Sequence, residues 1–156
     1  MKELDKQLSK IRRWCAMQER CLVEVKIHAN SLGFSDKNTD KIIRQLVEEG
    51  CINEERYATL SAGGKFRNKK WRRSRIIGEL KARQISDAAI KAGLSEIDEE
   101  DYRNVIVGMV EHKIAVTDRS NMMLFKHRLA KPAIAKGYEP ELVGEIIDEL
   151  MKRKKI

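Results

Sequence analysis

Aromatic residues, prolines and glycines are scarce in this sequence. Only 5% of its 156 residues are aromatic, and it contains 2 prolines and 9 glycines. Lysine, glutamate, arginine, leucine and isoleucine are frequent instead, and all of these are accommodated well in helices. The composition therefore favours helix over strand and predicts an all-α protein with a modest core, since 42% of the residues are apolar.

Cysteine is also rare, and long apolar runs are missing. The three cysteines, Cys15, Cys21 and Cys51, lack the spacing of metal ligands, and their odd number argues for reduced thiols. The segment Met1–Lys10 is too charged for a signal peptide. No apolar run approaches the roughly 20 residues that span a bilayer. We therefore expect a cytoplasmic protein with no membrane partner.

Catalytic motifs are missing as well. The histidines His28, His112 and His127 are scattered, and the sequence has no phosphate-binding loop, dinucleotide fingerprint or zinc-protease motif. The carboxylates of residues 96–101 lack the spacing of a calcium loop, which predicts a solvated linker. We expect no enzymatic activity, no metal and no cofactor.

What is present is helical periodicity along nearly the whole chain. It predicts nine helices, the first over Glu3–Met17, and capping residues indicate several of their ends. Either Ser35 or Asp36 suits the start of the third helix, Asn53 and Ser86-Asp87 suit later helix starts, and Pro140 suits a first turn. We expect Pro132 to kink or restart the eighth helix and the tail 152–155 to be frayed.

The helices form an internal repeat with a period of about 50 residues. Phe34, Ile85 and Tyr138 align, each followed by a polar helix start. Four further apolar columns keep this register: Val25, Ile76 and Leu129; Ala29, Leu80 and Ala133; Ile43, Leu94 and Ile147; Leu46, Ile97 and Leu150. The pattern predicts three tandem three-helix repeats over residues 1–50, 51–97 and 98–156, which gain a core by stacking.

The chain carries a net charge of +8, and one stretch accounts for it. Residues 65–83 contain nine cations and a single carboxylate, Glu79, with Phe66 and Trp71 interleaved. Cations can neutralise phosphates or face an acidic protein, and a ring can stack on a base. The alternative is a solvated surface with both rings in the core. We define the candidate surface as Lys65, Arg67, Lys69, Lys70, Trp71, Arg72, Arg73 and Arg75.

Three segments resemble the RecX family of recombinase regulators. Residues 52–58 read I-N-E-E-R-Y-A and follow L-V-E-E-G, residues 20–25 read R-C-L-V-E-V, and residues 65–80 match the family's basic segment. The resemblance covers about residues 11–150 and is strongest in the first two repeats. The chain departs from the family at Arg72, where glycine is common, which leaves the local turn open.

The resemblance implies an elongated, curved array of three-helix repeats that binds the RecA nucleoprotein filament. It further implies inhibition of RecA's ATPase and strand exchange, and hence regulation of DNA repair and recombination, without a cofactor. The candidate surface could also contact single- or double-stranded DNA, and we expect a monomer. The alternatives are a DNA-binding helical protein with no recombinase partner, a scaffold whose charges only keep it in solution, and an enzyme.

Overall fold

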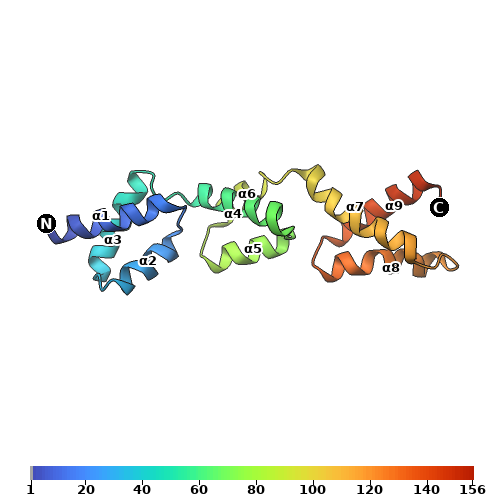
Figure 1. Cartoon of the computed structure of the whole chain (residues 1–156), viewed down its shortest axis with the longest axis horizontal. Helices are drawn as coiled ribbons and strands as arrows, with labels where there is room; N and C mark the ends of the chain where they lie inside the picture. The colour runs from blue at the N-terminus through green and yellow to red at the C-terminus, as the bar shows by residue number, and fades with distance from the viewer. Residues whose placement is uncertain (1) are drawn as a thin grey trace. The chain divides into compact units, whose positions relative to one another are not determined.

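The computed structural model describes residues 2–156, and this part of the chain contains nine α-helices and no strand (Figure 1). The all-α prediction is confirmed, and the helices fit three three-helix repeats. Their bounds are α1 Lys2–Met17, α2 Leu22–Ser31, α3 Asp36–Glu48, α4 Glu54–Lys69, α5 Arg73–Ala82, α6 Asp87–Leu94, α7 Glu99–Val116, α8 Met122–Ala135 and α9 Pro140–Lys154.

The predicted helix starts are confirmed by their hydrogen bonds. The Ser35 hydroxyl accepts from the Asn38 N–H at 3.1 Å, and the Ser86 hydroxyl accepts from the Ala89 N–H at 3.2 Å. The Asn53 side chain accepts from the Arg56 N–H at 2.8 Å. Each contact satisfies one of the free N–H groups that a helix start exposes.

Three local predictions are wrong in whole or in part. Residues 99–101 form the first turn of α7 rather than a linker, because Asp98 caps the helix and the acids favour its positive end. Helix α8 does not restart at Pro132, since Leu129 and Ala133 anchor it by burial on both sides, and a kink there stays a prediction. Helix α9 continues through Lys154, where its last basic residues favour the negative end of the helix.

The repeat appears in the backbone as one turn that recurs at the corresponding place in all three repeats. Gly33, Gln84 and Gly137 each adopt a left-handed conformation, with φ of +79°, +60° and +98°. The N–H of the following residue then bonds to the carbonyl five residues earlier, at 3.1 Å in all three cases. This closure ends a helix and redirects the chain. The three copies lie at the spacing that the apolar columns predict.

Burial confirms three of the five predicted columns completely. All members are at most 7% exposed in the columns that begin at Val25, Ala29 and Leu46. The column that begins at Ile43 is confirmed less well. In the first repeat the preceding residue, Ile42, is buried more deeply than Ile43 and is only 1% exposed. The corresponding position in the second repeat is Gly93, where an added Cβ would lie 2.8 Å from the Ala58 backbone. Helix α6 therefore approaches α4 too closely for a side chain there.

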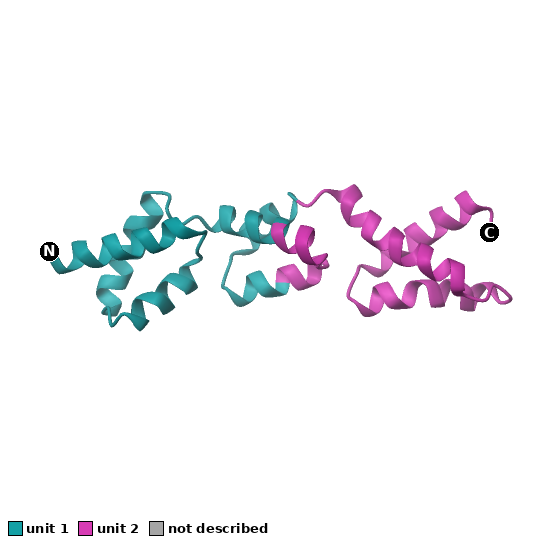
Figure 2. Cartoon of the chain, viewed as in Figure 1, with its two compact units in different colours: residues 1–63, 78–96 teal, residues 64–77, 97–156 magenta. Residues whose placement is uncertain are grey.

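The chain divides into two compact units (Figure 2). Unit 1 comprises residues 1–63 and 78–96, and unit 2 comprises residues 64–77 and 97–156, so that the division passes through α4 and α5. In unit 1, helices α1, α2 and α3 share one core. Its buried members are Ile11, Cys15, Val25, Ala29, Ile42, Leu46 and Ile52. The limits of the three repeats remain a prediction.

In unit 2, α7, α8 and α9 pack against one another around a second core. Tyr102, Ile106 and Val110 line the inner side of α7, and none of them is exposed. The opposing helices contribute Phe125, Leu129, Ala133, Val143, Ile146, Ile147 and Leu150. These apolar side chains, at helical spacing, fix which face of each helix is left for other contacts.

Candidate interaction surface

The eight residues of the candidate surface all lie in the 64–77 segment of unit 2, around the turn between α4 and α5. Lys70 takes the left-handed conformation, with φ of +56°, and its N–H bonds to the Phe66 carbonyl at 2.9 Å. The Tyr138 hydroxyl donates to the Lys70 carbonyl at 2.9 Å. The turn is therefore made at Lys70, so it needs no glycine at position 72.

Trp71 gathers three of the cations. Its side chain lies largely in the core, since the residue is only 9% exposed. The Arg75 guanidinium carbon lies 3.9 Å from the ring centroid, and the Nζ atoms of Lys65 and Lys69 lie at 4.9 and 5.4 Å. A cation over an aromatic face is held by the ring quadrupole. Trp71 thus orients the positive charge of the surface.

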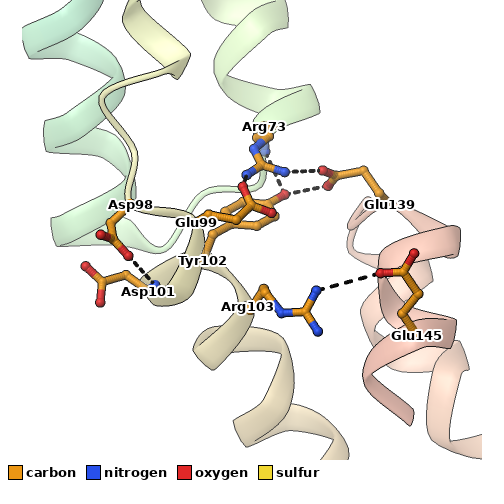
Figure 3. Close-up of polar contacts among 8 residues, drawn as sticks. All are labelled: Arg73, Asp98, Glu99, Asp101, Tyr102, Arg103, Glu139 and Glu145. Carbon is orange, nitrogen blue, oxygen red and sulfur yellow. Dashed lines mark hydrogen bonds and ion pairs between the residues drawn. The ribbon is translucent and has the colours of Figure 1, made fainter. Parts of the chain in front are cut away.

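Arg73 lies in a hydrogen-bonded network that joins α5 to α7 and to the start of α9 (Figure 3). Its guanidinium donates to Glu139 at 2.7 Å and also to Glu99. The Tyr102 hydroxyl accepts from the Arg73 N–H at 3.2 Å and donates to Glu139 at 2.6 Å. The Arg73 guanidinium carbon also lies 3.9 Å from the centroid of the Tyr102 ring. Its charge is therefore satisfied within unit 2.

The electrostatics of this network favour a charged Glu139. Burial pushes the pKa of Glu139 upward, but hydrogen bonds from Tyr102 and Arg73 outweigh it, so the pKa is lowered. Burial, above all, raises the pKa of Tyr102, which keeps the phenol protonated as a donor. The network therefore holds one carboxylate between a phenol and a guanidinium.

Two further contacts attach this segment to the turn before α9. The Ser74 hydroxyl donates to the Gly137 carbonyl at 3.1 Å. An added Cβ at Gly137 would lie 2.4 Å from Nε of Arg72, so the arginine side chain packs directly on that turn. Arg72 and Arg73 are half-buried as a result. The cations that remain exposed are Arg67, Lys69, Lys70 and Arg75.

Arg67 and Lys70 border a shallow depression between α4 and α7. Its floor includes Phe66, which is 5% exposed. The side formed by α7 consists of Asp101, Asn104 and Val105. An apolar floor with polar and cationic walls can accept a flat or short polar side chain of a partner.

The sequence predictions missed Tyr102, Glu139 and Asn104 as members of this region. One signal was available for Glu139. Glutamate is a poor N-cap, and here its side chain makes no capping bond to α9, so its carboxylate is available to other donors. No sequence signal pairs Tyr102 with Arg73, because the contact depends on how α5 and α7 pack.

The signature segment 52–58 has a structural role in unit 1. The Arg56 guanidinium donates to Glu19 at 2.8 Å and to the carbonyls of Gly50 and Cys51 at 2.9 and 3.3 Å. The Glu54 carboxylate accepts from the N–H and hydroxyl of Ser86 at 2.5 and 2.9 Å. The segment thus joins α4 to the end of α3 and to the start of α6.

Residues 2–156 hold no group of three or more His, Cys, Asp or Glu side chains placed to bind a metal. Burial, above all, raises the pKa of the Cys15 thiol to about 11 and also raises that of Cys21. These thiols are therefore weak nucleophiles near neutral pH. Within the same residues, none of the helices combines the length and the apolarity that a membrane span requires.

No protein-family model and no curated protein sequence matches this chain. Solved structures do match it. The crystal structure of RecX from Lactobacillus salivarius aligns with a TM-score of 0.81 and 18% identity, over 96% of this chain and 97% of that one. A crystal structure of a regulatory protein RecX aligns with a TM-score of 0.75 and 13% identity, over 93% of this chain and 73% of that one. The chain therefore has the RecX fold, as the resemblance predicts.

Proposed function

We propose that this protein binds the RecA nucleoprotein filament and lowers its ATPase and strand-exchange activities, as a regulator of DNA repair and recombination. The observation that carries the proposal is the RecX fold over 96% of the chain. The three repeats, 1–50, 51–97 and 98–156, would act together as a cytoplasmic monomer without a cofactor.

The charge of the candidate surface supports a polyanionic or acidic target. Arg67, Lys69 and Lys70 are exposed, and no carboxylate among residues 2–156 lies within 4.0 Å of their charged nitrogens. Charges that are free in the unbound protein can steer association and neutralise phosphates or acidic side chains. In this proposal Arg73 positions the surface through Glu139 and Tyr102, while the exposed cations make the contact.

A direct DNA-binding protein is the second candidate, and the same exposed cations favour it. Such a protein would bind DNA without recombinase, and its affinity would fall steeply with salt. Reversing two phosphate contacts would then reduce the slope of log affinity against log salt by about 1.4 to 1.8, from about 0.7 to 0.9 for each contact.

The test compares two charge-reversed double variants. Arg67→Glu with Lys70→Glu changes the candidate surface, and Lys37→Glu with Lys41→Glu changes exposed positions on α3 of unit 1 by the same total charge. At stoichiometric amounts, the wild-type protein and the α3 variant should lower ATP hydrolysis by RecA on single-stranded DNA. The candidate-surface variant should need about tenfold more protein.

Two outcomes contradict the proposal. If the wild-type protein leaves both ATP hydrolysis and strand exchange unchanged, it is not a regulator of this filament. If the candidate-surface and α3 variants lose inhibition equally, total charge rather than this surface is responsible. Binding to DNA that is equally strong with and without RecA supports the second candidate instead.

A further inference from the structure

Helix α8 of unit 2 carries an apolar stripe on its exposed side that no sequence motif indicated. Its buried side chains, Phe125, Leu129 and Ala133, face the unit 2 core. The opposite side presents Met123, which is 84% exposed, and Ile134, which is 42% exposed. An amphipathic helix ordinarily places polar residues there, so this second apolar side requires an explanation.

The stripe has the spacing of a helix-docking seam. Met123, His127, Ala130 and Ile134 are separated by four, three and four residues, which is the a/d spacing of helices that pack side by side. The small side chain of Ala130 in the middle permits close approach of a second helix. We define these four residues as the α8 stripe, which is apolar at Met123, Ala130 and Ile134 and polar at His127.

Cations flank the α8 stripe on both sides. Lys126 and Lys131 occupy the positions that correspond to g and e of a heptad, where charges select the partner helix. Over residues 112–136 the sequence has six lysines and arginines and only one carboxylate, Asp118. Lys126 lies 3.5 Å from Asp148, a residue whose side chain is 70% exposed. Lys126 is thus paired with Asp148, whereas no carboxylate among residues 2–156 lies within 4.0 Å of Lys131, so the flanks of the stripe keep an excess of positive charge.

A depression beside the stripe adds a place for an anionic side chain. Three cations, Lys113, Arg128 and Lys131, line it together with Val116, Thr117, Asp118 and Pro132. The carboxylate of Asp118 is engaged by Ser120, which donates from its N–H at 3.0 Å and from its hydroxyl at 2.8 Å. Within residues 2–156, none of the three cations has a carboxylate within 4.0 Å. Val116 and Pro132 provide apolar surface next to that charge.

We propose that the α8 stripe is a docking site for an acidic amphipathic helix of a partner protein. The apolar side of that helix would cover Met123 and Ile134, and its glutamates or aspartates would reach Lys126, Lys131 and the depression. This site lies outside the candidate surface of residues 65–75 and does not depend on the proposed function.

Charge, apolar character and helical spacing together decide against the other occupants. A second copy of this chain would bring Lys126 and Lys131 against the same lysines, which disfavours pairing. Nucleic acid would gain nothing from the apolar centre of the stripe, since phosphates require cations. A lipid surface would cover the apolar side chains but would make no use of the helical a/d spacing. An acidic helix satisfies both the apolar stripe and its basic flanks.

The experiment uses the full chain and a fluorescein-labelled three-heptad peptide with leucine at a and d and glutamate at e and g. A peptide with lysine in place of glutamate is the charge control. We expect fluorescence anisotropy to detect binding of the acidic peptide only. Ile134→Asp and Met123→Asp should each weaken it by about tenfold or more, because they place a charge against apolar side chains.

Lys126→Glu with Lys131→Glu should weaken binding and make it less sensitive to salt, and Lys37→Glu with Lys41→Glu should leave it unchanged. Circular dichroism verifies that each variant is folded. Because Met123 is exposed, its substitution should not disturb the fold. Equal binding of both peptides, or no effect of Ile134→Asp and Met123→Asp, overturns the proposal. The proposal is also overturned if the protein self-associates and Ile134→Asp abolishes this self-association. It is overturned as well if the protein sediments with phosphatidylserine vesicles and does not bind the peptide.

Discussion

The same helix-turn-helix junction is built differently in the two units. In unit 1 it occurs at Ser35 and at Ser86, whose hydroxyls cap the next helix. In unit 2 the equivalent residue is Glu139, which makes no capping bond and instead accepts from Arg73 and Tyr102. The backbone turn is the same in all three copies, but the side chain that follows it contacts different elements.

This difference shows how one repeat copy can acquire a positioning role. Ser35 and Ser86 cap their own helices, and Ser86 also donates to Glu54, whereas Glu139 makes no cap and fixes the segment that carries the exposed cations. Tyr138 adds a bond to the Lys70 carbonyl, and Gly137 accepts one from Ser74. Unit 2 therefore uses its junction to hold the basic segment 64–77, while unit 1 uses Glu54 to hold Ser86.

The largest effect should come from the core column that both units share. Leu46 in unit 1 and Leu150 in unit 2 are 0% and 2% exposed. Leu46→Ala and Leu150→Ala should each lower the free energy of unfolding by about 2–4 kcal/mol, because each leaves a cavity. Chemical denaturation measures the change, with the exposed Val47→Ala as control. Losses below about 1 kcal/mol at both sites would contradict the equivalence of the columns.

Tyr102→Phe should test the junction of unit 2 next. It removes the hydroxyl that donates to Glu139 and accepts from the Arg73 N–H, at a residue with no exposure. We expect a loss of about 1.5–3 kcal/mol, because a charged acceptor loses a buried donor. Ser86→Ala in unit 1 removes the cap and the bond from the hydroxyl to Glu54, and should cost about 1 kcal/mol because both contacts are near solvent. Equal losses in denaturation experiments would show that the two junctions do not differ in strength.

Most of the fold could be predicted because it depends on local signals. The helix starts at Ser35, Asn53 and Ser86 follow from side chains that bond to their own backbone neighbours. The apolar columns predicted the register of the three repeats, and a left-handed residue lies at the same place in each, even though it is Gln84 in the second. The expected linker at residues 99–101 and the expected restart at Pro132 were wrong, because the helix dipole and tertiary contacts override a local preference.

The candidate surface was less predictable, because charge alone does not distinguish an exposed cation from a paired one. Arg73 and Arg67 look equivalent in the sequence. Only the packing of α5 against α7 places Arg73 beside Glu99 and Glu139 and leaves Arg67 exposed. The exposed stripe of α8 was missed for a related reason. Helical periodicity indicates that the segment is a helix with an apolar side, but it does not show that the helix is apolar on two sides.

Gln84→Gly should measure the strain of a side chain in the left-handed turn of the second repeat. Gln84 has φ of +60° where the other copies have glycine, and it is exposed. A side chain in the left-handed region is strained, so glycine should raise the free energy of unfolding by about 0.5–1 kcal/mol despite its greater chain entropy. Thermal and chemical denaturation test this, with Gln84→Ala as the control that keeps the strain. A loss of stability would mean that the Gln84 side chain makes a contribution that outweighs the strain.

The smallest effect should be the pH dependence of the Glu139 network. Because the folded-state pKa of Glu139 is lowered, its contribution is complete above the unfolded pKa, about 4.3, and is lost as the pH falls through the folded value. The Glu139 side chain is 40% exposed, so solvent screening limits the contribution to about 0.5 kcal/mol. Glu139→Gln should therefore be less stable than the wild type at neutral pH, and the difference should shrink in acid below the folded pKa. The exposed Glu96→Gln is the control. A difference in stability that stays constant over this pH range would mean that Glu139 acts as a neutral hydrogen-bond acceptor. The charge of Glu139 would then not distinguish the junction of unit 2 from those of unit 1.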